Sequence, residues 1–134
     1  MNEERFPPGK YYVGDLCYVL SEKNGYDWDH LLAQTNCLQL DERHPRSDKG
    51  VFEYHGTTFF SSRTAWGDGR FWDGEGRWYG VDAGLIGCFP VGALGDKPAI
   101  YGGHVVEFSQ EFLCSVCDED GDIHIGHLSI KTDP

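Results

Sequence analysis

The segment from residue 66 to residue 84 (WGDGRFWDGEGRWYGVDAG) interleaves glycines with large aromatic rings, and it restricts the fold more than any other part of the chain. Glycine destabilises a helix interior and supplies the backbone conformations that tight turns need. Aromatic residues favour strands, where their rings pack on a pleated surface. The segment therefore argues against a long helix and predicts consecutive β-hairpins.

The same alternation of turns and short runs recurs along the chain, which has eighteen glycines and is 14% aromatic. Runs of β-forming residues flank turn dipeptides at His55 and Gly56, at 68–69 and at 120–121. A length of 134 residues suits one hydrophobic core. We predict a mainly β protein with a single β-rich domain over residues 1–134. Its expected architecture is a small β-barrel or β-sandwich of about eight short strands.

Two segments depart from this pattern. Residues 27–38 (DWDHLLAQTNCL) place apolar side chains on one helical face behind an acidic first turn, so we expect one helix there that closes an end of the domain. Residues 10–20 (KYYVGDLCYVL) predict either two short strands or one strand broken by a bulge around Gly14 and Asp15. The polar residues 41–49 predict a loop.

The chain is acidic, with 22 Asp and Glu against 11 Lys and Arg and a net charge of −11. Because neutralisation of phosphates by Lys and Arg drives binding to duplex nucleic acid, we expect no duplex as a ligand. The charge also allows mimicry of nucleic acid, although ordinary solubility explains it equally well. No apolar run reaches the ~20 residues that span a bilayer, and the first residues carry no export signal. We therefore expect a cytoplasmic protein that does not bind membranes.

Three short motifs suggest chemistry that their context does not support. The HIGH tetrapeptide at 124–127 resembles a nucleotide-binding motif of synthetases, but here it lies in an alternating segment typical of a strand. Cys114 and Cys117 form a CxxC without a second pair to complete a zinc site. The acidic run 118–122 lacks the rest of a calcium loop. We expect no metal site, no cofactor and no catalytic residue, and we expect the five cysteines to be free thiols.

The Trp-rich segment is locally balanced in charge. Between residues 63 and 77, three arginines offset three acids: Arg63, Arg70, Arg77, Asp68, Asp73 and Glu75. The rings could all be core residues, yet they exceed what two hairpins require, so we expect some of them to line a groove. There a Trp would stack on a base, an Arg would pair with phosphate, and Asp68 or Asp82 would orient a sugar hydroxyl. The predicted ligand-binding residues are Arg63, Trp66, Asp68, Arg70, Trp72, Arg77, Trp78, Tyr79 and Asp82.

Three sequence elements follow one another along the chain. They are GD-x-CYVL at 14–20, GDG at 67–69, and at 79–90 a match to Y-x-VDAG-x-IG-x-P in which two residues, Cys88 and Phe89, precede Pro90. In this order they resemble a family of small uncharacterised proteins from bacteria and their phages, whose pattern has proline where this chain has Leu16. The resemblance implies a compact β-rich domain in a bacterial or phage setting, and it implies no established reaction. Asp15 and Asp82 lie beside glycines, where they can accept backbone hydrogen bonds in tight turns or anchor a ligand.

These features lead to three functional hypotheses. The first is a non-enzymatic binding domain, a bacterial or phage accessory protein that sequesters a small anionic, nucleotide-like ligand in anti-defence, by analogy alone. The second is an acidic inhibitor or immunity-like partner that meets a basic host protein through residues 111–134, where six carboxylates stand against Lys131. The third is a small metal-dependent hydrolase that uses Asp68, Asp73, Asp82 and a histidine. An exposed aromatic patch could instead form a homo-oligomer interface.

Overall fold

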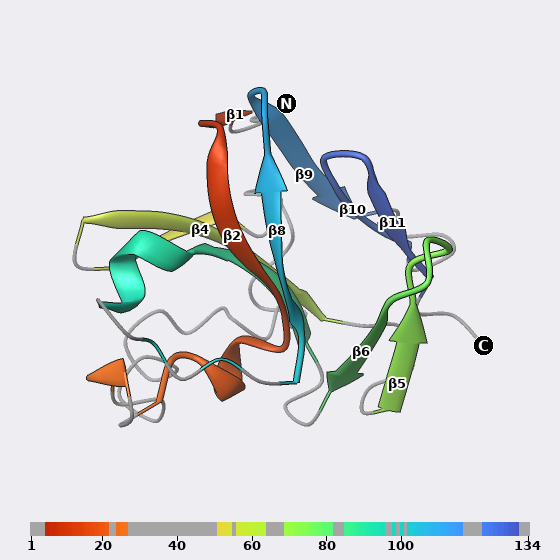
Figure 1. Ribbon diagram of the computed structural model, residues 1–134, viewed down its shortest axis with the longest axis horizontal. Helices are drawn as coiled ribbons and strands as arrows, with labels where there is room; N and C mark the ends of the chain where they lie inside the picture. The colour runs from red at the N-terminus through yellow and green to blue at the C-terminus, as the bar shows by residue number, and fades with distance from the viewer. Residues whose placement is uncertain are drawn as a thin grey trace, which may run out of the picture.

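The computed structural model of the protein is mainly β (Figure 1). It describes residues 5–21, 24–26, 51–54, 56–63, 69–81, 85–95, 98, 100, 102–116 and 122–131. These residues form eleven strands, arranged as a five-stranded, a four-stranded and a two-stranded sheet. Every strand pairing in the three sheets is antiparallel. The same residues include two short 3-10 helices, η1 (Leu16–Tyr18) and η4 (Val91–Leu94).

The five-stranded sheet has the order β3-β4-β7-β2-β8. Its strands are β2 (Gly9–Gly14), β3 (Val51–Tyr54), β4 (Thr57–Arg63), β7 (Leu85–Pro90) and β8 (His104–Phe108). Strands β3 and β4 form a hairpin whose turn contains Gly56 at a φ of 80°, a conformation that favours glycine. Strand β2 pairs with β7 on one side and with β8 on the other, so its main chain is hydrogen-bonded along both edges.

The four-stranded sheet has the order β1-β9-β10-β11. Its strands are β1 (Arg5–Phe6), β9 (Phe112–Val116), β10 (Ile123–Ile125) and β11 (Leu128–Ile130). The chain passes between the two sheets twice, from β1 to β2 through Pro7 and Pro8 and from β8 to β9. Because proline has no N–H to donate to a ladder, the two prolines end one strand before the next begins. Phe6 then lies opposite Phe112 in one sheet while Gly9 lies opposite Phe108 in the other.

Apolar side chains cover both faces of the five-stranded sheet. One buried cluster includes Tyr11 and Val13 of β2 together with residues of the four-stranded sheet and of strands β5 (Gly69–Trp72) and β6 (Trp78–Val81). The other includes Tyr12, residues of η1 and η4, and the rings of Phe59 and Phe89, whose centroids lie 5.3 Å apart. Successive residues of a strand point to opposite faces, so a strand covered on both faces buries all of its side chains. This explains why residues 11–14 are all buried.

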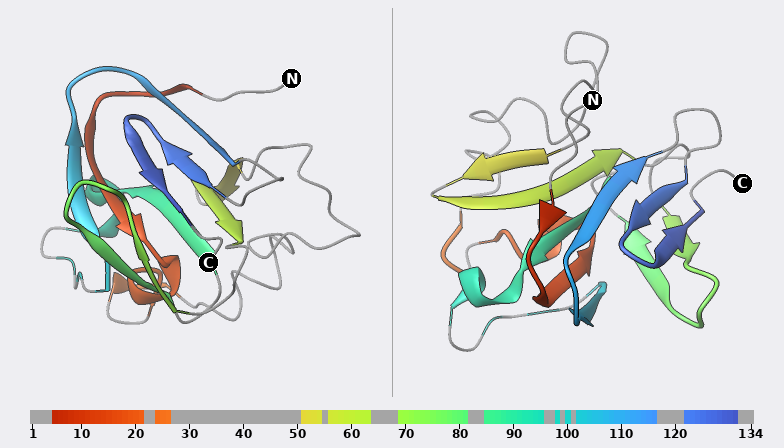
Figure 2. Two further views of the ribbon diagram at one scale, coloured as in Figure 1. Left: turned by 90° about the vertical axis from the view of Figure 1, so that its right-hand side faces the viewer. Right: turned by 90° about the horizontal axis from the view of Figure 1, so that it is seen from above.

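The third sheet is the hairpin of β5 (Gly69–Trp72) and β6 (Trp78–Val81), which bridges the two larger sheets (Figure 2). At β6, the amide of Gly80 donates to the carbonyl oxygen of Gly102, which precedes β8, at 2.9 Å. At β5, the carbonyl oxygen of Trp72 accepts from the amide of Lys131, which follows β11, at 3.4 Å. The hairpin therefore lies between the start of β8 and the end of β11.

The mainly β fold expected from the sequence is confirmed, with eleven short strands where about eight were predicted. The described strands form open, layered sheets, because β3 and β8 lie at opposite edges of the five-stranded sheet and do not pair with each other. The helix predicted at 27–38 lies outside the described residues. Residues 10–20 differ from both alternatives: one strand, β2, ends at Gly14 and η1 follows it.

The HIGH tetrapeptide also departs from the expected continuous strand. Ile123 and Ile125 share one face of β10 and are buried there, but the chain reverses at Gly126 and His127. Gly126 has a φ of 59°, and Ile125 pairs with Leu128 across this two-residue turn. Asp-Gly and similar dipeptides signalled other hairpins, whereas Gly-His gave no such signal.

Among the described residues, no helix has the length and apolar character needed to cross a bilayer.

Candidate functional site

The β5–β6 hairpin separates inward-facing from outward-facing side chains. Phe71 lies opposite Tyr79, and both side chains are buried in the core. On the other face, Trp72 lies opposite Trp78 and Arg70 lies opposite Gly80, and the three side chains are exposed. This alternation follows from the two-residue period of a strand. One face of the hairpin anchors it to the core, and the other presents an arginine and two indoles.

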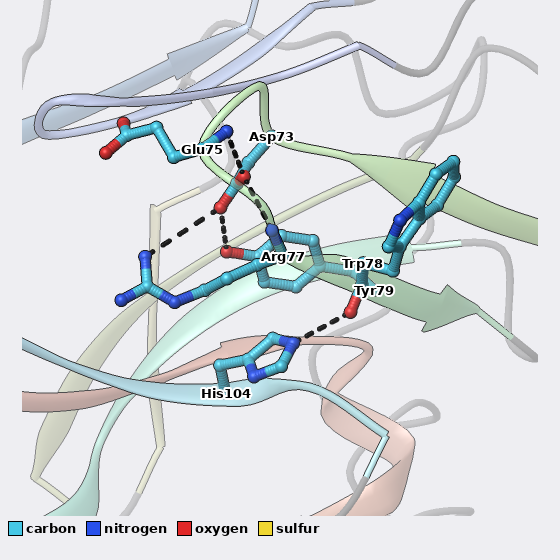
Figure 3. Close-up of polar contacts among 6 residues, drawn as sticks. All are labelled: Asp73, Glu75, Arg77, Trp78, Tyr79 and His104. Carbon is cyan, nitrogen blue, oxygen red and sulfur yellow. Dashed lines mark hydrogen bonds and ion pairs between the residues drawn. The ribbon is translucent and has the colours of Figure 1, made fainter.

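Asp73 closes the hairpin loop (Figure 3). Its Oδ1 accepts hydrogen bonds from the amides of Glu75 at 2.8 Å and Arg77 at 3.2 Å, while its Oδ2 accepts from the Tyr79 hydroxyl at 2.7 Å. The Asp73 amide donates to the Arg77 carbonyl oxygen at 3.2 Å. Gly74 and Gly76, at φ values of 78° and 92°, let the chain turn around this carboxylate. The loop is thus an aspartate-centred turn that fixes the register of the two strands.

The environment of Asp73 keeps it ionised. Burial favours the neutral acid, but the hydrogen bonds from Tyr79, Glu75 and Arg77 and the Arg77 guanidinium hold the pKa of Asp73 below its usual range. Arg77 Nη1 lies 4.0 Å from Asp73 Oδ2. Burial and the bond to Asp73 raise the pKa of Tyr79 well above its ordinary value, so its hydroxyl remains a donor. Both oxygens of Asp73 are therefore occupied by hairpin groups, which leaves this carboxylate poorly placed to act as a metal ligand or general base.

His104, at the start of β8, holds the base of β6. Its Nε2 donates to the carbonyl oxygen of Trp78 at 2.8 Å, which places the ring proton on that nitrogen (Figure 3). The imidazole also meets the ring of Tyr79 edge-to-face, with centroids 5.2 Å apart. Together with the bond between Gly80 and Gly102, these contacts fix β6 on both sides of Tyr79.

The outer face of the hairpin carries what we call the aromatic platform, defined as Arg70, Trp72 and Trp78. The indoles of Trp72 and Trp78 stack with centroids 6.1 Å apart and an interplanar angle of 19°. They are 48% and 50% exposed. The Arg70 guanidinium carbon lies 5.4 Å from the Trp78 ring centroid, within the range of a cation–π contact. The platform therefore combines flat apolar surface with a cation that is held in place.

The structure brings only part of the predicted ligand set together. Arg70, Trp72 and Trp78 share the exposed face, whereas Tyr79 lies fully buried beneath it and donates to Asp73. Arg77 faces the Asp73 carboxylate at the loop. Arg63 ends β4 in the five-stranded sheet, where it pairs with Leu85 of β7, and only its backbone is described. Trp66, Asp68 and Asp82 lie outside the described residues.

Sequence reasoning missed the supports of the platform. Asp73 was counted as one of three balancing acids, although the Asp-Gly dipeptide that it begins is itself a turn signal. His104 and Gly102 lie more than twenty positions from the strand that they hold, and no local pattern pointed to them. Asp15 behaves as expected, because its carboxylate accepts from the Cys17 amide at 3.0 Å and caps η1.

Two cavities lie elsewhere on the described surface. One, of about 530 Å³, is bounded by β1, by the segments that begin β2 and β4, and by the end of β7 with η4. The other, of about 380 Å³, lies between the turn that follows β8 and the turn at Gly126 and His127. Neither cavity includes a residue of the aromatic platform, so the platform is an exposed face rather than part of either hollow.

The thiols of Cys88 and Cys114 lie in the core between the larger sheets. Both are buried, and Cys17 is partly exposed; all three are free thiols. Burial, with the adjacent Cys114, raises the pKa of Cys88 well above its ordinary value. Cys117, the other half of the CxxC, lies outside the described residues. Among the residues that are described, no group of three His, Cys, Asp or Glu side chains has the arrangement of a metal site.

Comparison of the chain with protein-family models, with curated proteins and with solved structures gave no match. The proposals below therefore rest on the geometry of the described residues.

Proposed function

We propose that this protein is a non-enzymatic binding protein that holds a small nucleotide-like anion on the aromatic platform. The observation that carries the proposal is the stacked, half-exposed pair of Trp72 and Trp78 with the Arg70 guanidinium beside it. A base can stack on an indole, and a guanidinium can donate two parallel hydrogen bonds to a phosphate. In a phage setting, such binding would sequester a nucleotide signal of the host.

The balance of charges limits what the platform would hold. Arg70 forms no ion pair with another described residue, so its fork is available to a phosphate. The net charge of −11 opposes anions at long range, and this repulsion grows with the charge of the ligand. A ligand with one phosphate group is therefore favoured over a polyphosphate. Stacking is worth about 1–3 kcal/mol per base, and a charge-assisted hydrogen bond from Arg70 about 1.5–3 kcal/mol. Together they bracket the roughly 4–5.5 kcal/mol of a dissociation constant of about 0.1–1 mM, which we expect for a mononucleotide.

Titration of the protein with AMP, adenosine and inorganic phosphate tests this proposal. Tryptophan fluorescence excited at 295 nm reports stacking on the platform, and two-dimensional NMR locates the shifted indole N–H groups. We expect AMP to bind more tightly than adenosine, because Arg70 contacts the phosphate, and phosphate alone to bind weakly. Arg70→Gln should reduce AMP affinity by about tenfold, as loss of a charge-assisted hydrogen bond requires, without changing adenosine affinity.

Arg77→Gln is the matched control, since it removes a cation from the same hairpin but not from the aromatic platform. A larger loss of AMP affinity in Arg70→Gln than in Arg77→Gln supports the proposed surface. Equal AMP affinities in the wild type and both variants, or shifts confined to residues outside β5 and β6, would contradict it.

A protein partner is the second candidate, because the platform is an exposed face that neither described cavity includes. Tryptophan and arginine are enriched among the residues that dominate protein interfaces. The acidic chain would favour a basic partner, whose association should slow steeply as salt is raised. A Trp78→Ser variant would lose such a partner, whereas a control substitution at the exposed Val105 would keep it.

A further inference from the structure

The cavity of about 530 Å³ lies at the end of the five-stranded sheet where β2 and β4 begin. Strand β1 and the prolines after it form one wall, and the β3–β4 turn forms the opposite wall. Its volume falls within the range typical of small-molecule sites. Twelve residues line it, and every one of them belongs to the described part of the chain.

The charge of this cavity is opposite to that of the protein. Arg5 and Lys10 are both exposed at its lining, and none of its twelve lining residues is acidic, although the whole chain carries a charge of −11. Within the described residues, neither Arg5 nor Lys10 forms an ion pair. Glu107 is the cross-strand neighbour of Lys10, but it lines the second cavity instead. The two cations thus have no carboxylate partner inside the cavity.

Apolar and hydroxyl groups complete the lining. Pro7 and Pro8 supply exposed apolar surface, whereas Phe6 and Tyr11 line the cavity as core residues that are only 2% and 3% exposed. Thr57 and Thr58 carry hydroxyls at the start of β4. Burial raises the pKa of Tyr11 to about 12, so its hydroxyl is neutral at physiological pH and does not repel an anion. The lining therefore offers cations, hydroxyl donors and apolar surface together.

The walls of the cavity are held in place before any ligand arrives. The Tyr11 hydroxyl donates to the Pro7 carbonyl oxygen at 2.7 Å, which ties the β1–β2 connection to the sheet. Tyr11 also meets the ring of Phe112 edge-to-face at 4.9 Å, and Phe6 stacks on Phe112 at 5.5 Å. A preformed site avoids the entropic cost of ordering its walls when a ligand binds.

We propose that this cavity binds a small organic anion with an aromatic body, whose charged group lies between Arg5 and Lys10. The aromatic body lies against Pro7 and Pro8, and a threonine hydroxyl at the start of β4 donates to a remaining anionic oxygen. The proposal does not depend on the aromatic platform, because the two sites share no residue.

A matched pair of fluorescent probes tests the proposal. The first is 8-anilino-1-naphthalenesulfonate, an aromatic anion, and the second is N-phenyl-1-naphthylamine, which has the same rings without the sulfonate. Both are titrated into the full-length protein in its native state at pH 7 and low salt. We expect Arg5→Gln and Lys10→Gln each to raise the dissociation constant of the anionic probe by about fivefold to tenfold. Each substitution removes a charge-assisted contact that solvent partly screens. Binding of the neutral probe should not change.

Lys131→Gln is the matched control, because Lys131 is an exposed lysine that does not line the cavity. It should leave both probes unaffected. NMR shifts caused by the anionic probe should fall on the amides of Lys10, Gly56 and Thr57. If all three variants lost the same affinity for the anionic probe, the loss would reflect only the net charge of the protein, and the proposal would be overturned. Shifts centred on Trp72 and Trp78 would also overturn it, although they would favour the aromatic platform as an anion site.

Discussion

Tyr79→Phe removes one hydroxyl from the buried end of the β5–β6 hairpin. In the wild type this hydroxyl donates to Asp73 Oδ2 at 2.7 Å, and neither side chain reaches solvent to any extent. Because hydrogen bonds to charged groups contribute about 1.5–3 kcal/mol, we expect the free energy of unfolding to fall by about 2 kcal/mol at pH 7. Urea denaturation followed by tryptophan fluorescence measures this loss directly.

The loss should depend on pH with a definite sign. The pKa of Asp73 is lowered in the folded protein, so its ionised form stabilises the fold at pH values above the unfolded pKa of about 3.9. That contribution disappears as pH falls through the folded pKa. Without the Tyr79 donor, the folded pKa of Asp73 moves up and less stability is lost on acidification. The difference in the free energy of unfolding between the wild type and Tyr79→Phe should therefore become smaller below about pH 4.

Tyr11→Phe is the matched control. The Tyr11 hydroxyl donates to the neutral carbonyl oxygen of Pro7 at 2.7 Å, so we expect a loss of about 1 kcal/mol that does not depend on the ionisation of a carboxylate. Equal losses for the two variants, constant from pH 7 to pH 3, would refute the idea that Tyr79 acts by stabilising a charged Asp73.

Two further predictions concern the core. Gly87→Ala would place a Cβ 2.6 Å from Leu16 Cδ1 and against the Phe60 carbonyl oxygen, so we expect a severe loss of stability in thermal unfolding. Gly92→Ala is the control: its Cβ would meet nothing within 4 Å, so its effect on stability should be nearly neutral. Cys88 is fully buried with a raised pKa, so iodoacetamide should modify it in peptide mapping only after the protein is unfolded; modification of the native protein at the rate of a free thiol would count against the packing.

Local sequence patterns, namely turn dipeptides and alternating side chains, predicted much of the fold because several strands and turns follow them. The turn at Gly56 was read correctly from its dipeptide. The hairpin turn predicted at 68–69 is wrong, because β5 begins at Gly69 and pairs with β6, whereas β4 pairs with β3 and β7. The alternating pattern also indicated the strand β10 correctly. These features depend on residues within one or two turns of each other, which is the range over which propensity acts.

The remaining features depend on contacts between distant segments. The consecutive tyrosines of β2 are both buried because the five-stranded sheet is covered on both faces, a property of the whole domain rather than of the strand. Tyr79 belonged to the predicted ligand set, and its burial follows from the direction in which the hairpin meets the core. The anion cavity joins segments near residues 5–11, 56–58 and 90–93, which no sequence motif connects.

The pairing of β2 with β8 also determines when the domain can form during synthesis. Tyr11 lies opposite Val106, and Phe6 lies opposite Phe112. Strands β1 and β2 therefore cannot complete their pairing until β8 and β9, about a hundred residues later, have been synthesised. Contacts between such distant residues slow folding, because the loop must close before the pairing stabilises it. While the ribosome is still adding the intervening residues, β2 has only β7 beside it. Its unsatisfied edge is then open to other nascent chains, and the yield of folded protein should depend on how quickly translation reaches residue 116.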